Sequence, residues 1–263
     1  MTSGAWRQTR HTVEVGGVLA EAPRGLPGGA PSTTAAHPPH SEIRTRPMDP
    51  EPQIHLELGP LLGSGGFGEV YQARMRSRGG LQTVVAVKVT HPNVILLDDA
   101  VTRLRDEGLL LARIQHPVVV RALDLLQIQG RLALVTEYVP GADLTRFVQG
   151  PDPIPPRALV AVIGRVASAL HAAWSAPGPD GAPLRIVHRD IKPSNIRIGR
   201  HGEVRLLDFG IARFQGSARE STTSGVLIGS MPYLAPERLT GCQTLPPADV
   251  FGLGCCLYEG LAR

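Results

Sequence analysis

One stretch of the chain combines acids, a lysine and an amide at short, fixed spacing. Residues 188–195 read HRDIKPSN, and residues 208–210 read DFG. These segments contain two acids, an amide and a lysine: Asp190, Asp208, Asn195 and Lys192. Carboxylate and amide oxygens are hard ligands that suit Mg²⁺, and a lysine can neutralise a phosphate. The set therefore indicates metal-assisted phosphoryl transfer and does not suit acyl transfer or redox chemistry.

The pattern H-R-D-x-K-P-x-N followed by D-F-G resembles the eukaryotic-like serine/threonine protein kinases of bacteria. The resemblance implies ATP- and Mg²⁺-dependent transfer of the γ-phosphate to Ser or Thr hydroxyls of proteins, autophosphorylation included. It implies that Asp190 accepts the hydroxyl proton, Lys192 contacts the γ-phosphate, and Asn195 and Asp208 hold Mg²⁺. Lys192 followed by Pro193 matches the Ser/Thr form of this loop.

Short apolar runs must position these side chains. Residues 184–187, 195–198 and 204–207 are apolar runs that resemble strands. Two short strands joined by a turn are therefore expected to present the acids, the lysine and the amide at their ends.

A glycine-rich segment, residues 63–70, fits G-x-G-x-x-G-x-V. Glycine lets the backbone N–H groups approach phosphate oxygens closely. A dinucleotide-binding fingerprint would open a helix after its last glycine, whereas Glu69-Val70-Tyr71 continues as a strand, which favours the kinase form. Lys88 follows Gly68 by 20 residues on another strand-like run. By resemblance, the contacts to ATP include Gly63, Ser64, Gly65, Gly66, Phe67, Gly68, Val70, Ala86 and Lys88.

Lys88 needs an anion to hold its flexible side chain, and Glu107 is the expected partner. Glu107 lies nine residues before His116-Pro117, on a helix expected over 98–113. It stands three residues after Leu104 and four before Leu111, so it shares their inward stripe. Two neighbouring acids remain as rivals: Asp98 and Asp106.

Residues 134–141 are expected to link the two lobes as a hinge. The resemblance implies that backbone groups of Glu137 and Val139 bind adenine and that Asp143 binds the ribose. Thr136 stands at the gatekeeper position.

Arg197 departs from the family pattern, because its position normally carries an aliphatic side chain beneath the purine. We expect its methylene stem to lie there while the guanidinium reaches solvent.

The activation segment is expected to run from Asp208 to Glu237. Arg189 suggests control by phosphorylation, because a guanidinium pairs bidentately with a phosphate. Ser230 stands where relatives usually have Thr, and Asp249 resembles the buried acid that braces the catalytic loop. The candidate phosphorylation sites are Ser221, Thr222, Thr223 and Ser224, for each of which a solvated polar loop is the alternative.

The expected fold is α+β and bilobal. A five-stranded antiparallel sheet with one helix forms the N-lobe over 53–139, and a mostly helical C-lobe covers 140–263. The predicted strands are 54–62, 68–75, 83–89, 118–128 and 131–139, and the predicted C-lobe helices are 157–174 and 246–261.

Residues 1–52 are rich in Pro and Gly without periodicity and are expected to form a disordered tail. Met48 is an alternative start of translation.

The resemblance also implies further C-lobe helices after 246–261, so the chain reads as a C-terminally truncated kinase domain.

The composition says little about which functional class the protein belongs to. The net charge of +4, with only 4% aromatic residues, gives no sign of nucleic-acid binding. An odd count of three cysteines suggests a reducing compartment, and we see neither a signal peptide nor an apolar run near 20 residues. The expectation is a cytoplasmic signalling protein that acts on protein substrates, with homodimerisation as a further expectation.

Two rival functions stay open. An inactive fragment that binds a nucleotide or a partner would lack γ-phosphate transfer. A small-molecule phosphotransferase of the same fold would not need the segment that ends in Ala235-Pro236-Glu237, since that segment serves protein substrates.

Overall fold

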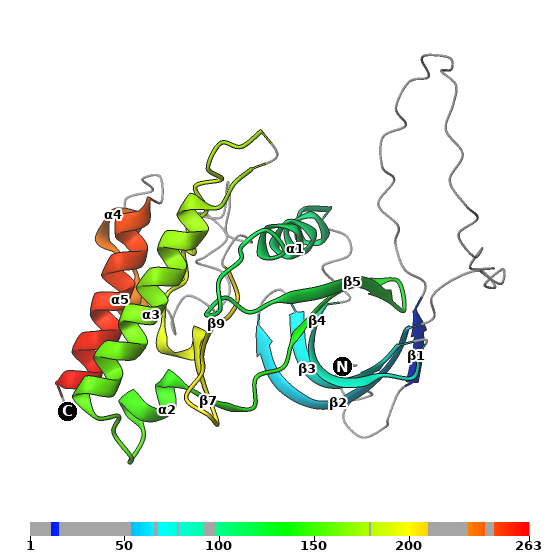
Figure 1. Ribbon diagram of the computed structural model, residues 1–263, viewed down its shortest axis with the longest axis horizontal. Coiled ribbons are helices and arrows are strands. Elements are labelled where there is room, and N and C mark those ends of the chain that lie inside the picture. Colours follow the sequence, from blue (N-terminus) through cyan, green and yellow to red (C-terminus); the bar gives the residue numbers. More distant parts are fainter. Residues whose placement is uncertain are drawn as a thin grey trace, which may run out of the picture.

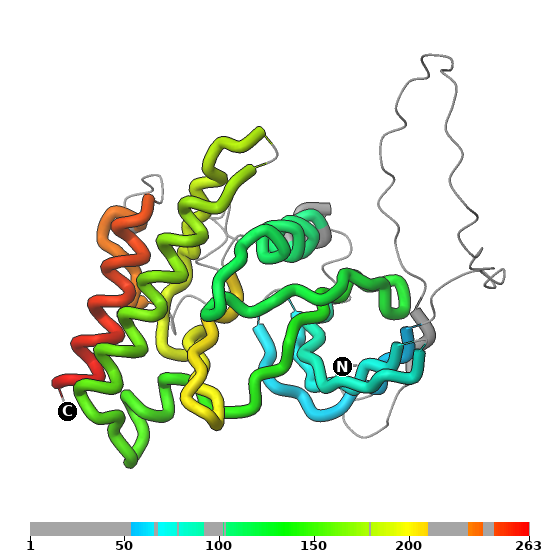
Figure 2. The backbone as a smooth tube through the Cα atoms, viewed as in Figure 1, coloured from blue at the N-terminus to red at the C-terminus, as the bar shows by residue number. Residues whose placement is uncertain are grey.

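A computed structural model describes residues 12–15, 54–65, 68–77, 79–91, 98–178, 180–209, 231–239 and 245–262. A curved sheet occupies one side of these residues and a group of helices the other (Figure 1). The backbone passes from sheet to helices after strand β6, at the boundary between the two parts (Figure 2). This division has the expected bilobal form.

The sheet has the strand order β1-β2-β3-β4-β6-β5, and all of its pairs are antiparallel. The five predicted strands are confirmed, with the bounds β2 Ile54–Gly65, β3 Gly68–Arg76, β4 Gln82–Thr90, β5 Ala122–Ile128 and β6 Arg131–Glu137. The predicted strand over 118–128 starts late, because Val119 and Val120 instead pair with Leu206. β1, Thr12–Val15, adds an edge strand on β2, so the expectation of disorder is wrong at these four residues.

Alternating side chains build the core of the sheet. Val85, Val87 and Val89 on β4 are all buried on one face, as expected for period two in a strand. β6 lies between β4 and β5 and buries both faces: Ala133 and Val135 join that same cluster, whereas Leu132 and Leu134 lie on the side of α1. β6 thus joins the sheet to the core that the helices share.

Helix α1, Asp98–Leu111, covers this second face of the sheet (Figure 1). It ends two residues before the predicted end at 113. Gly108 is poor for helix stability, yet a Cβ atom there would lie 3.0 Å from the Leu134 Cδ1 atom. The glycine therefore lets α1 approach β6 closely. The residue before it, Glu107, is thereby brought toward the sheet.

The helical part begins with β7, Gly141–Asp143, and α2, Leu144–Gln149. β7 pairs with β8, Ile196–Gly199, which pairs with β9, Val204–Leu206. Helices α3, Pro156–Ser175, and α5, Pro246–Leu261, lie side by side, and α5 has the predicted bounds (Figure 1). A short helix, α4, Pro236–Leu239, precedes α5.

Among the described residues, α3 is long and apolar enough to cross a membrane by length and composition. This contrasts with the expectation that no apolar run approaches that length. Its Leu159, Val166 and Ala173 are fully buried in the shared core, as in the core helices of many soluble proteins, so this is weak evidence for a membrane span.

Candidate active site

Lys88 joins the sheet, α1 and the segment after β9 through ion pairs. Its Nζ atom lies 3.1 Å from Glu107 Oε2, 3.2 Å from Glu107 Oε1 and 3.1 Å from Asp208 Oδ1. Glu107 is 2% exposed and faces inward on α1, as its register predicted. Its exposed neighbour Asp106 is therefore not the partner. The structure brings together three residues that the sequence assigned from separate motifs.

Burial and charge oppose each other in this cluster. Burial lowers the pKa of Lys88, but Asp208 and Glu107 outweigh it and raise that pKa above its usual value. Lys88 holds the pKa of Asp208 below its usual value. Burial raises the pKa of Glu107, although Lys88 opposes the change. Lys88 is therefore firmly cationic at neutral pH and held in one place by two acids.

Phe209 fixes the direction of Asp208. The Phe209 side chain is 1% exposed, and its ring centroid lies 4.6 Å from that of the buried His188. Asp208 has a φ of +47°, a left-handed conformation that is uncommon for a residue other than glycine. Such strain at a ligand-binding residue is consistent with a functional role.

The catalytic loop brings its acid, lysine and amide together, but residues 184–187 before it do not form the expected strand. Lys192 Nζ lies 2.8 Å from Asp190 Oδ2. A short 3₁₀ turn, Pro193–Asn195, folds the chain back so that Asn195 Nδ2 donates to the Asp190 carbonyl at 2.7 Å and to Asp190 Oδ2 at 3.2 Å. The amide therefore holds Asp190 through both its backbone and its carboxylate.

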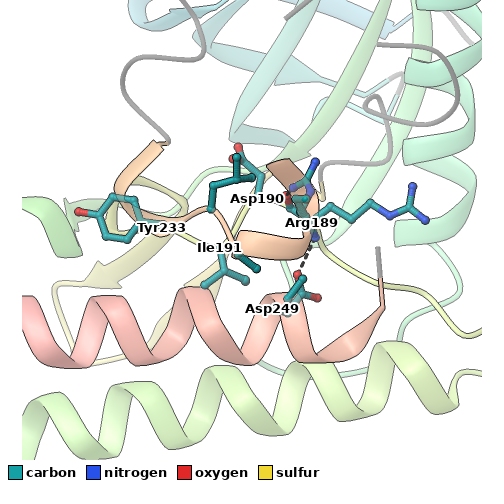
Figure 3. A pocket seen from close by; sticks show the side chains of 9 residues that line it. Arg189, Asp190, Ile191, Tyr233 and Asp249 are labelled. Carbon is teal, nitrogen blue, oxygen red and sulfur yellow. Dashed lines mark hydrogen bonds between the residues drawn. The ribbon is translucent and has the colours of Figure 1, made fainter. Parts of the chain in front are cut away.

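Asp249, in the first turn of α5, braces the same loop from below (Figure 3). Its two carboxylate oxygens accept the backbone N–H groups of His188 and Arg189, each at 2.7 Å. Arg189 has a φ of +71°, which lets consecutive N–H groups converge on one carboxylate. Burial raises the pKa of Asp249, but His188 and the two N–H donors oppose this change. The predicted bracing role is consistent with these bonds.

Replacing Asp249 with asparagine is expected to lower the free energy of unfolding by about 2 kcal/mol, because an amide offers only one acceptor oxygen to two buried N–H groups. Urea denaturation measures the change. Asp180→Asn is a matched control, since Asp180 Oδ1 also accepts a backbone N–H, that of Ala182, but in an exposed loop. An equal loss in both variants would contradict the bracing role.

The donor set suits Mg²⁺. Asp208 supplies a carboxylate, and Asn195 bonds to Asp190 through its amide nitrogen, so the amide oxygen is not used in those bonds. Within the described part of the chain, no three His, Cys, Asp or Glu side chains are grouped to hold a metal. Two protein oxygens are what a Mg²⁺ ion needs when it also binds phosphate and water.

The predicted glycine loop forms the turn between β2 and β3. Gly63, Ser64 and Gly65 end β2, and Gly68 opens β3, whereas Gly66 and Phe67 lie outside the described residues. A Cβ atom on Gly68 would lie 2.2 Å from the Val89 carbonyl oxygen, so only glycine allows this approach to β4. Val70 pairs directly with Lys88, so the strand that leaves the loop lies beside the strand that carries the lysine.

The predicted hinge lies beside β8. Ala86 on β4 pairs with Thr136 on β6, and the chain then runs through Glu137 and Val139 to Asp143. Arg197 on β8 does not extend into solvent as expected: its Nε, Nη1 and Nη2 atoms donate to oxygens of Val139, Asp143 and Gly141. Its long side chain can thus lie along the hinge without leaving the protein.

A pocket opens beside Asp190, between the catalytic loop and residues 233–238 (Figure 3). Tyr233 lines it, and the Tyr233 hydroxyl donates to Glu259 Oε2 on α5 at 2.6 Å. Burial and this acid raise the pKa of Tyr233. This pair was not predicted, and its sequence signal is a tyrosine just before the Ala235-Pro236-Glu237 motif.

Several regulatory predictions fall outside the described residues: Ser221, Thr222, Thr223, Ser224 and Ser230. Arg189 is described, and its carbonyl oxygen accepts a short hydrogen bond from Arg238 Nη1. Its suggested pairing with a phosphate stays a prediction.

Known proteins are similar to this chain in sequence. The family described as protein kinase domain matches residues 56–263. The tyrosine-protein kinase MasK of Myxococcus xanthus is 34% identical over 77% of this chain. The serine/threonine-protein kinase PknB of Mycobacterium leprae is 35% identical over 77% of this chain. In both cases the match covers 32% of the relative, so the chain spans about a third of their length.

Solved structures agree on the fold. The kinase domain of Mycobacterium tuberculosis PknI superimposes with a TM-score of 0.55 at 27% identity. The similarity covers 78% of this chain and 71% of that domain.

Proposed function

The chain belongs to the protein kinase family, and on that premise we propose that it transfers the γ-phosphate of ATP to serine or threonine hydroxyls of proteins, itself included. The observation that carries the proposal is the Lys88 cluster. A kinase works only when its strand lysine, its helix glutamate and its DFG aspartate are in place together. Here Lys88 Nζ contacts both Glu107 oxygens and Asp208 within 3.2 Å.

Asp190 acts as the base in this proposal. The substrate hydroxyl oxygen forms a bond to the γ-phosphorus, the bond from that phosphorus to the β,γ-bridging oxygen breaks, and ADP leaves. The hydroxyl proton passes to the carboxylate of Asp190. Asn195 orients this carboxylate, and Lys192, 2.8 Å from it, supplies positive charge where negative charge develops.

ATP would lie between the glycine loop and the hinge. We propose that Lys88 binds its phosphates, backbone groups of Glu137 and Val139 bind the adenine, and Asp143 binds the ribose. Asp208 and Asn195 would hold Mg²⁺. When bound, this ion neutralises phosphate charge and orients the triphosphate.

Serine and threonine are the proposed acceptors, because Lys192-Pro193 has the form of the Ser/Thr-specific loop. PknB, by its name, is a serine/threonine kinase, and MasK, by its name, is a tyrosine kinase. The acceptor class therefore needs its own experiment.

The test is transfer of ³²P from [γ-³²P]ATP by the full chain to peptide libraries whose only acceptor is Ser/Thr or Tyr. We expect labelling of the Ser/Thr library and of the chain itself with Mg²⁺, and none with EDTA. Labelling of the Tyr library alone would overturn the acceptor class. Magnesium-dependent ATP binding without transfer would favour a nucleotide-binding module instead.

We also propose a cytoplasmic, signalling role with protein substrates as partners. The support is the family's chemistry, which uses ATP, and two free cysteines in the described residues, Cys255 and Cys256. Homodimerisation stays a prediction.

A further inference from the structure

Arg197 bonds to the hinge at three points. Its Nε donates to the Val139 carbonyl at 2.6 Å, its Nη1 to Asp143 Oδ1 at 2.7 Å, and its Nη2 to the Gly141 carbonyl at 2.9 Å. The side chain is 20% exposed although it carries a full charge. All three acceptors belong to one five-residue segment, so a single planar guanidinium fixes the whole turn.

The strand register determines this contact. Asp143 on β7 pairs directly with Arg197 on β8, so their side chains lie on the same face of the small sheet. The pair uses only Oδ1 of Asp143, and that side chain is 40% exposed. Arg197 thus holds one carboxylate oxygen and leaves the carboxylate accessible to a ligand.

We propose that Arg197 is a positioning residue for ribose recognition: it holds the Asp143 carboxylate in the orientation that accepts hydrogen bonds from the sugar hydroxyls. The inference rests on the proposed function, because Asp143 meets a ribose only if the chain binds ATP. It adds a prediction that the proposed function lacks, namely that Arg197 affects sugar selectivity without touching the triphosphate.

The selectivity has a simple physical origin. Sugar hydroxyls donate to a carboxylate, and 2′,3′-dideoxy-ATP lacks both donors. A hydrogen bond to a charged acceptor favours ATP over the dideoxy analogue by roughly tenfold or more. A carboxylate released from Arg197 can rotate into solvent, so part of this preference is then lost.

The test compares dissociation constants of the full chain for ATP and for 2′,3′-dideoxy-ATP, each with Mg²⁺, by calorimetry. We expect Arg197→Leu to lower the ratio of the two constants about threefold to tenfold, mainly by weakening ATP binding. Asp143→Ala should lower it at least as much. The double variant should match Asp143→Ala, because Arg197 acts through Asp143.

Arg205→Leu is the matched control. Arg205 pairs with Arg197 across β8 and β9, and its Nε atom lies 3.2 Å from Glu137 Oε1; the Arg205 side chain is 24% exposed, close to the 20% of Arg197. This variant should leave the nucleotide ratio unchanged. Arg197→Lys should give an intermediate ratio, because an ammonium can keep the charge but not three aligned donors.

The outcomes separate the two proposals. If the unaltered chain binds neither nucleotide, the proposed function fails. If it binds ATP but does not distinguish the dideoxy analogue, or if Arg197→Leu weakens both nucleotides equally, the inference about Arg197 is wrong while ATP binding stands.

Discussion

Replacing Asp190 with asparagine is expected to reduce phosphoryl transfer by about 10³-fold, as for the loss of a general base. The asparagine has nearly the same shape and can still accept from Asn195 Nδ2 at the position of Oδ2. It cannot take the hydroxyl proton, and it removes the negative charge 2.8 Å from Lys192 Nζ. Activity should therefore fall far more than stability.

Single-turnover transfer with [γ-³²P]ATP measures the chemical step, and calorimetry with the same nucleotide measures binding. The affinity for ATP should change by no more than about threefold, because Asp190 meets the acceptor hydroxyl rather than the nucleotide. Asp180→Asn, the same change in an exposed loop, should leave transfer intact. Retention of more than a tenth of the activity in Asp190→Asn would contradict the assignment of Asp190 as base.

The catalytic residues could be predicted because they lie close together in sequence. Asp190, Lys192 and Asn195 lie in one loop that closes with the 3₁₀ turn Pro193–Asn195, so their short spacing restricts how far apart they can lie. Glu107 was predictable for a different reason: its spacing from Leu104 and Leu111 placed it on the buried face of a helix, and it is 2% exposed.

Contacts that depend on strand register could not be predicted. Asp143 and Arg197 are 54 residues apart, and nothing local shows that β7 and β8 pair at these two positions. The expectation that Arg197 reaches solvent followed the usual behaviour of arginine and overlooked the carbonyl oxygens of the hinge. The Arg197 guanidinium instead donates to the carbonyl oxygens of Val139 and Gly141, which belong to a distant part of the sequence.

The missed strand β1 has the same cause. Thr12–Val15 is rich in β-branched residues, but the Pro- and Gly-rich composition around it hid a strand that pairs with the edge of β2. Gly108 is unfavourable in an isolated helix, but it leaves room for the close approach of the Leu134 side chain. At β1 and at Gly108, contacts with distant parts of the chain matter more than the local sequence preference.

Replacing Lys88 with methionine is expected to reduce transfer by roughly 10²–10³-fold, the usual cost of one electrostatic contact to the transition state. The change also leaves Glu107 buried without its cation, which costs about 3 kcal/mol of folding free energy. The two effects must be separated, since a poorly folded kinase is also inactive. The double variant Lys88→Met/Glu107→Leu removes the stranded charge, so it should recover most of the stability and none of the transfer.

The pH dependence of the free energy of unfolding shows whether the Glu107 carboxylate is left buried without a cation in Lys88→Met. Burial already raises the pKa of Glu107, and loss of Lys88 removes the main influence that lowers it. The folded state of Lys88→Met then holds a proton that the unfolded state releases above the ordinary pKa of 4.5. Its free energy of unfolding should be highest near pH 4.5 and fall as the pH rises, by up to about 1.4 kcal/mol per unit, until the folded-state pKa is passed.

Urea denaturation from pH 5 to 8 measures this slope in the unaltered chain, in Lys88→Met and in the double variant. The double variant should lose the added slope, because it has no carboxylate at position 107. Lys88→Met/Asp106→Leu is the matched control: Asp106 is exposed, so removing its carboxylate should leave the slope in place. Recovery of transfer together with stability in Lys88→Met/Glu107→Leu would show that Lys88 serves the fold alone, and the proposed phosphate contact would have to be given up.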